Sequence, residues 1–482
     1  MRVREVEYVL FNSFEYLFVF LPLTWAGYFL LQKLKMPQLA GVFLVAASFG
    51  FYSWWNPAYF PLLLGSIIFN FMCGRLLITV VYGPAQRQAL LLIGIVANLG
   101  LLGFYKYKDF FLANVNWLCG TDFAYGQLLL PLGISFFTFQ QLAYIIDCYR
   151  NQAPLYKLFP YALFVSFFPQ LIAGPIVHHR EMLHQFQQAG NRRVDSGHVS
   201  AGLYVLAMGL FKKVIMADSL AHWVSFGFNA PAELGLLEGW IVSLAYSLQL
   251  YFDFSGYTDM ATGTALMFNI RLPANFNSPY KAASIQDFWR RWHMTLGRFL
   301  RDYLYIPLGG SRGSQAATTR NLLITFFLAG LWHGAGWTFV LWGCLHGLAL
   351  VVHRGWRRLN WSMPKWLGIL LTFNFVNLAW VLFRAPDFQT AWAVIQAMFG
   401  GNGMSGSLFA GAGTGVFLNF ADVGTAMACV VSGLLICWFS KNSLEKREAF
   451  KPNALTAVAT AAMLVLSAVN LLEVSEFLYF NF

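Results

Sequence analysis

Long apolar runs dominate this chain, and short polar segments separate them. Many of the runs approach 20 residues, the length of one membrane-spanning helix. The pattern predicts about 11–13 transmembrane or re-entrant helices. We therefore expect an all-α polytopic membrane protein whose residues 1–482 form a single membrane domain. The runs lie at roughly 15–32, 38–56, 58–81, 88–112, 128–148, 156–177, 200–225, 237–268, 321–352, 366–384, 421–440 and 454–472.

One run, 321–352, is too long for a single span and too short for two full spans with a loop. Gly334 and Gly336 lie near its middle, which predicts two half-length helices that meet inside the bilayer. A single crossing with a re-entrant half is the alternative. Non-helical backbone at that depth must line protein or water, because lipid offers no hydrogen-bond partners. His333, which lies at this break, is therefore a candidate site residue.

Composition supports the membrane class. The chain is 58% hydrophobic and only 11% charged, whereas about a quarter of the residues in soluble domains are charged. The net charge of +11 comes from basic clusters between apolar runs, as positive cytoplasmic loops produce. We therefore expect contact with membrane lipids and no nucleic-acid binding. The six cysteines form no CxxC pair, and no metal site is expected.

A basic segment, 281–320, precedes the broken run and is predicted to be cytoplasmic. Its apolar residues recur every three or four positions from Phe288 to Tyr303, which predicts one amphipathic helix with Ser284 and Asp287 in a capping box and an end at Pro307. The helix is either an interfacial element that holds lipid phosphates or a platform for an anionic cytoplasmic substrate. The arginines concerned are Arg290, Arg291, Arg298 and Arg301.

The histidines allow two interpretations. His333 could be a packing residue bonded to a backbone carbonyl, or a neutral general base that deprotonates a hydroxyl. His293 alone would be an interfacial histidine, and His346 alone a structural one. Polar residues inside the 237–268 run either face the same cavity as His333 or cap a helix broken at Gly256. These residues are Asp253, Ser255, Tyr257 and Asp259.

Several motifs together resemble one family. WHGAGW at 332–337, followed by GCLHG at 343–347, resembles the signature of the membrane-bound O-acyltransferase superfamily. The bacterial alginate O-acetyltransferase branch is the most similar part of it. Further similar stretches are DFWRRWH at 287–293, RDYLYIPLGG at 301–310, FDFSGYTD at 252–259, LFNS at 10–13 and FLYFNF at 477–482.

The resemblance implies helices around a central tunnel, with the acyl donor entering from the cytoplasm and the acceptor from the opposite face. His333 matches the family's catalytic histidine, and His293 matches the second histidine of the bacterial branch, which the resemblance places nearby in the tunnel. The four arginines and Trp332 are then expected to bind the donor, acetyl-CoA, and no permanently bound cofactor is expected.

The resemblance also implies a function. It predicts a multi-pass enzyme of the bacterial inner membrane that acetylates an exported polysaccharide of the alginate, cellulose or peptidoglycan type. The expected partners are an extracytoplasmic SGNH, esterase-like acetyltransferase and a polysaccharide export complex. The alternatives are a transporter or channel for a small anion or lipid-linked sugar, a D-alanyl-transferring relative, and an inactive scaffold.

Overall fold

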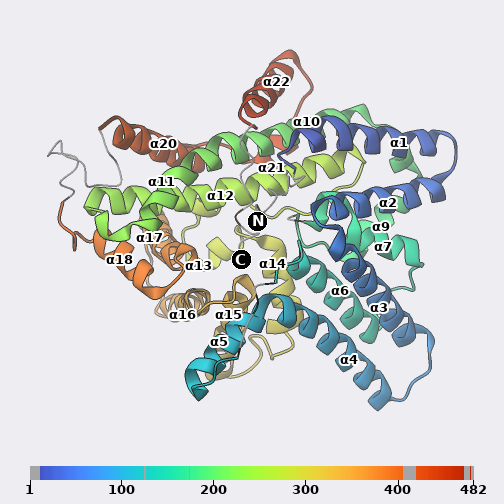
Figure 1. Ribbon diagram of the computed structural model, residues 1–482, viewed down its shortest axis with the longest axis horizontal. Coiled ribbons are helices and arrows are strands. Elements are labelled where there is room, and N and C mark those ends of the chain that lie inside the picture. Colours follow the sequence, from blue (N-terminus) through green and yellow to red (C-terminus); the bar gives the residue numbers. More distant parts are fainter. Residues whose placement is uncertain are drawn as a thin grey trace. The chain divides into compact units, whose positions relative to one another are not determined.

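The computed structural model describes residues 11–123, 126, 128–172, 174–404, 420–471 and 478 (Figure 1). All regular secondary structure within these residues is helical, which confirms the predicted all-α class. Leu10 and all of the closing motif except Leu478 lie outside the described residues.

The chain divides into two compact units. The first contains 1–210, 257–273 and 450–476, and the second contains 211–256, 274–449 and 477–482. The helix α12, Leu236–Met267, contributes residues to both units. The single domain predicted over 1–482 stays a prediction.

Prolines start several helices of the first unit. Pro22, Pro37, Pro61 and Pro84 each lie in the first two positions of a helix, where the missing N–H group costs no hydrogen bond. The helices of this unit are η1 (Glu15–Phe20), α1 (Leu21–Lys33), α2 (Pro37–Trp55), η2 (Pro57–Tyr59), α3 (Phe60–Thr79), α4 (Pro84–Leu102), η3 (Gly103–Tyr107), α5 (Lys108–Cys119), α6 (Ile134–Tyr149), α7 (Leu158–Ser166), α8 (Phe168–Leu171), α9 (His179–Gln187), η4 (Ala189–Arg192), α10 (Ser196–Phe211) and α22 (Ala454–Val469).

The second unit holds the motifs around both histidines. Its helices, besides the first part of α12, are η5 (Lys212–Ala217), α11 (Asp218–Asn229), η6 (Pro231–Glu233), η7 (Pro279–Lys281), α13 (Ile285–Trp289), α14 (Met294–Leu300), η8 (Arg301–Tyr305), α15 (Gln315–His333), α16 (Trp337–Arg358), α17 (Lys365–Arg384), α18 (Phe388–Met398), α20 (Phe420–Phe439) and α21 (Ser443–Glu448).

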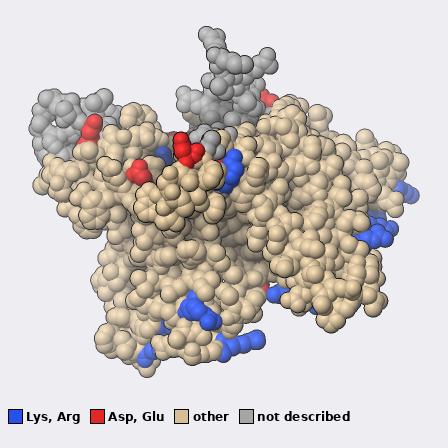
Figure 2. Space-filling model, turned by 60° about the horizontal axis from the view of Figure 1, so that its bottom comes forward, with Lys and Arg blue, Asp and Glu red and all other residues tan. Residues whose placement is uncertain are grey.

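Four helical stretches of the described chain are long and apolar enough to cross a membrane. They are Pro57–Thr79, Pro84–Cys119, Ser196–Asn229 and Lys365–Arg384. Large apolar side chains such as Trp117 and Phe111 are mostly exposed, as expected of a surface that faces lipid. The face shown in Figure 2 carries few Lys, Arg, Asp or Glu side chains. The predicted total of about 11–13 crossings stays a prediction.

The broken run folds as a helical hairpin, and its break lies where the sequence predicts. Helix α15 ends at His333 and α16 begins at Trp337, and the two helices lie side by side (Figure 1). The prediction of two half-length helices is wrong, because the helices contain 19 and 22 residues. Each helix extends beyond the apolar run into polar residues, because polar residues can also adopt a helical backbone.

The segment from Ser284 to Ser311 is not one helix. Helix α13 ends at Trp289 and α14 begins at Met294, after His293 adopts a left-handed backbone with φ 43° and ψ 51°. The predicted N-cap is present, since the Ser284 hydroxyl accepts the Asp287 N–H at 3.2 Å. The Asp287 carboxylate accepts the N–H of Ala283 instead of closing the box on Ser284. Hydrogen bonds from residues 291–295 to residues 275–277 hold the chain in a non-helical course between the two helices.

The 156–177 run also breaks. Helix α7 ends at Ser166, and the four-residue α8 follows after Phe167. Pro169 accounts for the break, because a proline inside a helix removes one N–H donor and collides with the preceding turn. The predicted single span is therefore wrong for this run.

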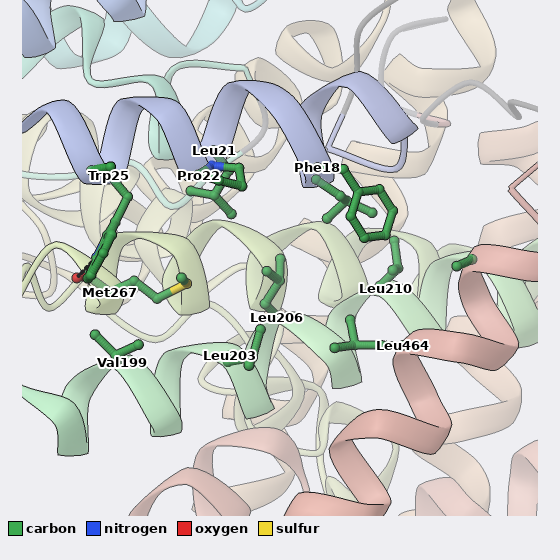
Figure 3. A pocket seen from close by; sticks show the side chains of 13 residues that line it. Phe18, Leu21, Pro22, Trp25, Val199, Leu203, Leu206, Leu210, Met267 and Leu464 are labelled. Atoms are coloured by element: carbon green, nitrogen blue, oxygen red, sulfur yellow. Dashed lines mark hydrogen bonds between the residues drawn. The ribbon is translucent and has the colours of Figure 1, made fainter.

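The first unit contains an apolar pocket of about 480 Å³ (Figure 3). Trp25 lines the pocket, and it donates its indole N–H to the Met267 carbonyl at 3.0 Å. The described residues that line it carry no titratable side chain. The lining residues are Leu17, Phe18, Leu21, Pro22, Trp25, Ala26, Val199, Leu203, Leu206, Leu210, Met267, Leu464 and Ala468.

Candidate active site

His333 is the last residue of α15 and is 2% exposed. Aromatic rings surround its imidazole. The ring centroid lies 4.9 Å from that of Trp332, 5.0 Å from that of Trp342 and 5.2 Å from that of Phe383. All three rings meet the imidazole edge to face, so the site presents a histidine within a wall of apolar surface.

His293 lies beside His333. Its ring centroid is 6.5 Å from that of His333 and 6.1 Å from that of Trp332. Phe254 of α12 packs edge to face against it at 4.8 Å, and the side chain is fully buried. The fold thus brings together the two histidines that the resemblance singled out, from separate elements of the second unit.

Two glycines allow the hairpin to hold His333 in place. A Cβ atom on Gly343 would collide with the Phe326 carbonyl and lie 2.9 Å from the Gly330 Cα. A Cβ on Gly330 would in turn collide with the Phe339 carbonyl and lie 3.0 Å from the Gly343 Cα. The backbones of α15 and α16 therefore touch directly at this crossing, as small residues permit in membrane helix pairs.

The ionisation of His293 follows from its surroundings. Burial lowers the pKa of His293 to about 3, because water no longer solvates the charged form. A neutral imidazole at physiological pH can accept a proton, which general base catalysis requires. Its Nδ1 lies 3.1 Å from the Oδ1 of Asn275.

The four arginines differ in their contacts. Arg291 pairs with Asp287 at 2.8 Å and donates to the Asn277 carbonyl at 3.2 Å, so its guanidinium braces the α13 loop. Arg301 is exposed and pairs with the neighbouring Asp302 at 2.7 Å. Arg290 is exposed and Arg298 is half-buried. All four belong to the second unit, as do both histidines.

The polar residues of α12 have other partners. Asp253 is buried and forms an ion pair with Lys213 at 2.7 Å, and it accepts the N–H of Leu478 at 3.1 Å. Ser255 accepts a 3.4 Å hydrogen bond from Lys212. Helix α12 continues through Gly256, so the alternative of a helix broken there is wrong. The ion pair explains how a carboxylate is tolerated in this helix.

The remaining two candidates lie one turn later on α12, in the part assigned to the first unit. Tyr257 is fully buried and donates its hydroxyl to the Asn12 side chain at 2.9 Å. Asp259 is half-buried, and its backbone carbonyl accepts the Thr262 hydroxyl at 3.2 Å. The hydrogen bond of Tyr257 therefore links two segments of the first unit.

His346 is fixed by a neighbour that the sequence did not single out. The indole N–H of Trp289 donates to its Nδ1 at 3.2 Å, which ties α13 to α16. Trp342 and Phe383, which enclose His333, were also missed. Trp342 lies on α16 and follows His333 within one long apolar run, and Phe383 lies on α17, so only tertiary packing marks them as candidate site residues.

A second histidine cluster lies in the first unit. The Asp147 carboxylate is 2.7 Å from His178 Nε2 and 3.0 Å from His179 Nε2, an arrangement that could hold a metal ion. However, His178 Nδ1 accepts the backbone N–H of Arg180, so its Nε2 carries the proton and donates to Asp147. The Tyr156 hydroxyl lies 2.9 Å from His179 Nδ1. Hydrogen bonding therefore accounts for the cluster as a tie between α6 and the start of α9.

Comparison with known proteins gives the same family as the motifs. Residues 147–385 match the model of the MBOAT, membrane-bound O-acyltransferase family, and this range includes both candidate histidines. A peptidoglycan O-acetyltransferase of Helicobacter pylori is 45% identical, covering 100% of this chain and 99% of its own length.

More distant relatives cover less of the chain. A probable alginate O-acetylase of Pseudomonas aeruginosa is 40% identical over 81% of this chain and 75% of its own length. A teichoic acid D-alanyltransferase of Bacillus subtilis is 27% identical over 55% of this chain and 71% of its own. The chain is therefore a multi-pass membrane protein and an O-acyltransferase, and it belongs to the membrane-bound O-acyltransferase family.

Proposed function

We propose that this chain transfers an acetyl group from cytoplasmic acetyl-CoA across the inner membrane for the O-acetylation of an exported polysaccharide. His333 and His293 are the catalytic residues of the proposed reaction. The observation that carries the proposal is the proximity of these two buried imidazoles, 6.5 Å apart between ring centroids and enclosed by aromatic side chains.

The proposed chemistry needs few groups, because a thioester is already activated. One imidazole removes the proton from an acceptor hydroxyl while the hydroxyl oxygen forms a bond to the thioester carbon. The carbon–sulfur bond then breaks, and the imidazolium returns its proton to the departing thiolate. The aromatic wall of Trp332, Trp342 and Phe383 excludes water, which would otherwise hydrolyse the donor.

Donor binding is assigned to the basic segment and to Trp332. Coenzyme A carries several phosphates, which guanidinium groups bind well. Arg290 and Arg301 are exposed and Arg298 is half-buried, so these three are proposed to contact the phosphates. Arg291 already braces the α13 loop through Asp287, and its contribution to donor binding is proposed to be indirect.

The acceptor is proposed from the relatives. Two of them are named for the O-acetylation of peptidoglycan and alginate, and the first aligns with the whole chain. A glycan of the peptidoglycan type is therefore the first acceptor to test. An extracytoplasmic SGNH, esterase-like acetyltransferase is proposed to complete the transfer to the polymer in an export complex.

The test uses the purified protein in nanodiscs with radiolabelled acetyl-CoA. Thiol release and acetyl transfer to peptidoglycan fragments are measured for the wild type, His333→Ala and His293→Ala, with the partner supplied. Both variants are expected to lose at least about 100-fold in rate, the usual contribution of a general base. Binding of a nonhydrolysable thioether analogue of acetyl-CoA should persist in both.

The matched control is His353→Ala, a histidine on α16 outside the aromatic wall, which should keep the wild-type rate. Unchanged thiol release in His333→Ala would refute the assigned catalytic role. Transfer of D-alanine from a carrier protein, with no release of thiol from acetyl-CoA, would instead support the D-alanyl alternative.

A further inference from the structure

One asparagine touches three consecutive residues at the active site. Asn275 lies in the loop before α13, and it is 1% exposed. Its Oδ1 lies 3.1 Å from His293 Nδ1, and it accepts the Thr295 N–H at 3.2 Å and the Thr295 hydroxyl at 2.9 Å. Its backbone carbonyl accepts the N–H of Met294 at 3.0 Å.

These contacts define which atom of the asparagine faces the histidine. A backbone N–H can only donate, so the side-chain atom that meets the Thr295 N–H must be the amide oxygen. An amide oxygen can only accept, so His293 Nδ1 must carry a proton and donate it. In the neutral imidazole, Nε2 is then the atom whose lone pair can accept a proton.

We propose that Asn275 is a positioning residue for His293, and that it fixes both the tautomer with Nε2 as the basic atom and the orientation of the ring. The inference rests on the proposed role of His293 in acyl transfer. Second-sphere hydrogen bonds of this kind commonly select the histidine tautomer in catalytic sites.

The backbone supports this role. His293 adopts a left-handed conformation, which few residues other than glycine adopt without cost. The loop around Asn275 holds the chain in this conformation from both sides, because the Asn277 N–H donates to the Arg291 carbonyl at 2.9 Å and the Met294 N–H donates to Asn275. The segment therefore positions the ring through its backbone as well as its side chain.

The first test compares Asn275→Ala with Asn275→Asp. Alanine removes the acceptor, so kcat should fall at least about 10-fold while the KM for acetyl-CoA stays within about twofold, since Asn275 is not among the residues proposed to bind the donor. Aspartate keeps the acceptor and should restore most of kcat at pH 7.5. Asn374→Ala is the control, because its side chain bonds the Leu370 carbonyl of its own helix, α17, and not the histidine.

The second test is the pH profile. Phe254, Trp332 and His333 face His293 from α12 and α15, and of these three only His333 titrates. A carboxylate beside Nδ1–H stabilises the imidazolium and raises the pKa of His293, so the acid limb of kcat in Asn275→Asp should move upward by one pH unit or more. In ¹⁵N spectra of histidine-labelled protein, the wild type should show His293 as the Nδ1–H tautomer, identified by its loss in His293→Ala.

The outcomes separate the two proposals. Full activity in His293→Ala would refute the role of His293 and with it the proposed mechanism. An inactive His293→Ala combined with wild-type kcat in Asn275→Ala, or with an Nε2–H tautomer in the spectrum, would overturn the positioning role alone.

Discussion

Single hydrogen bonds and ion pairs explain how polar side chains are accommodated in the second unit. Trp289 and His346 show this at the edge of the candidate active site, where one indole N–H helps to link α13 to α16. Lys213 of η5 and Asp253 of α12 show it as well, and both side chains are almost completely buried. Removing one member of such a pair leaves the other in an environment that cannot solvate it.

Trp289→Phe tests the first contact. The ring remains, but the N–H donor to His346 Nδ1 is lost, so the free energy of unfolding should fall by about 1–2 kcal/mol. Thermal unfolding in detergent would show a lower Tm. Trp366→Phe, a change at an exposed position of α17, should leave Tm unaltered, and equal Tm values for the two variants would contradict the role of the hydrogen bond.

Lys213→Met tests the ion pair. The Asp253 carboxylate would remain buried without its cation, and the stability should fall by about 3–5 kcal/mol. Adding Asp253→Asn to the same chain removes the uncompensated charge and should restore much of the loss. The measurement is again Tm, and a double variant no more stable than the single one would show that the pair is not the source of the effect.

At the scale of elements, the α15–α16 hairpin depends on the direct contact of two backbones. Gly343→Ala places a Cβ against the Phe326 carbonyl and the Gly330 Cα, neither of which can move aside as a side chain can. We expect a loss of about 1–3 kcal/mol in stability and a lower rate of acyl transfer, because the hairpin carries His333.

Gly355→Ala is the matched control for that prediction. It lies on the same helix, α16, with open space around its Cα. Alanine should stabilise the helix there by about 0.5–1 kcal/mol, since it loses less backbone freedom than glycine on folding. If both variants had the same Tm, close packing at the crossing would not be the reason for Gly343.

The sequence predicts the presence of helices better than it predicts where they end and where they break. The break after His333 follows from Gly334 and Gly336. The full helix lengths do not follow from hydropathy, because α15 and α16 both include polar turns outside the apolar run. The single helix expected around His293 fails for another reason. Its left-handed residue is held by hydrogen bonds to residues 275–277, which no local periodicity contains.

At the scale of the whole molecule, the candidate site could be predicted from motifs but not from spacing. The proximity of His293 and His333 depends on how α13 and α14 pack on the hairpin, and the family resemblance supplied it before the geometry did. The aromatic wall and Asn275 had no comparable signal, since Trp, Phe and Asn are common throughout this chain. The metal-like cluster of Asp147 and two histidines was likewise visible only in three dimensions.

The proposed orientation across the membrane leads to the last prediction. Segment 281–320 carries seven basic residues against two acidic ones in the sequence, which favours the cytoplasmic side. Acetyl-CoA is too highly charged to cross a bilayer unaided. Inside-out vesicles should therefore release thiol when acetyl-CoA is added outside, whereas right-side-out vesicles should do so only after detergent treatment. The His333→Ala variant in inside-out vesicles gives the background rate. Equal rates in the two intact preparations would place the donor entrance on the opposite face and refute the proposed direction of transfer.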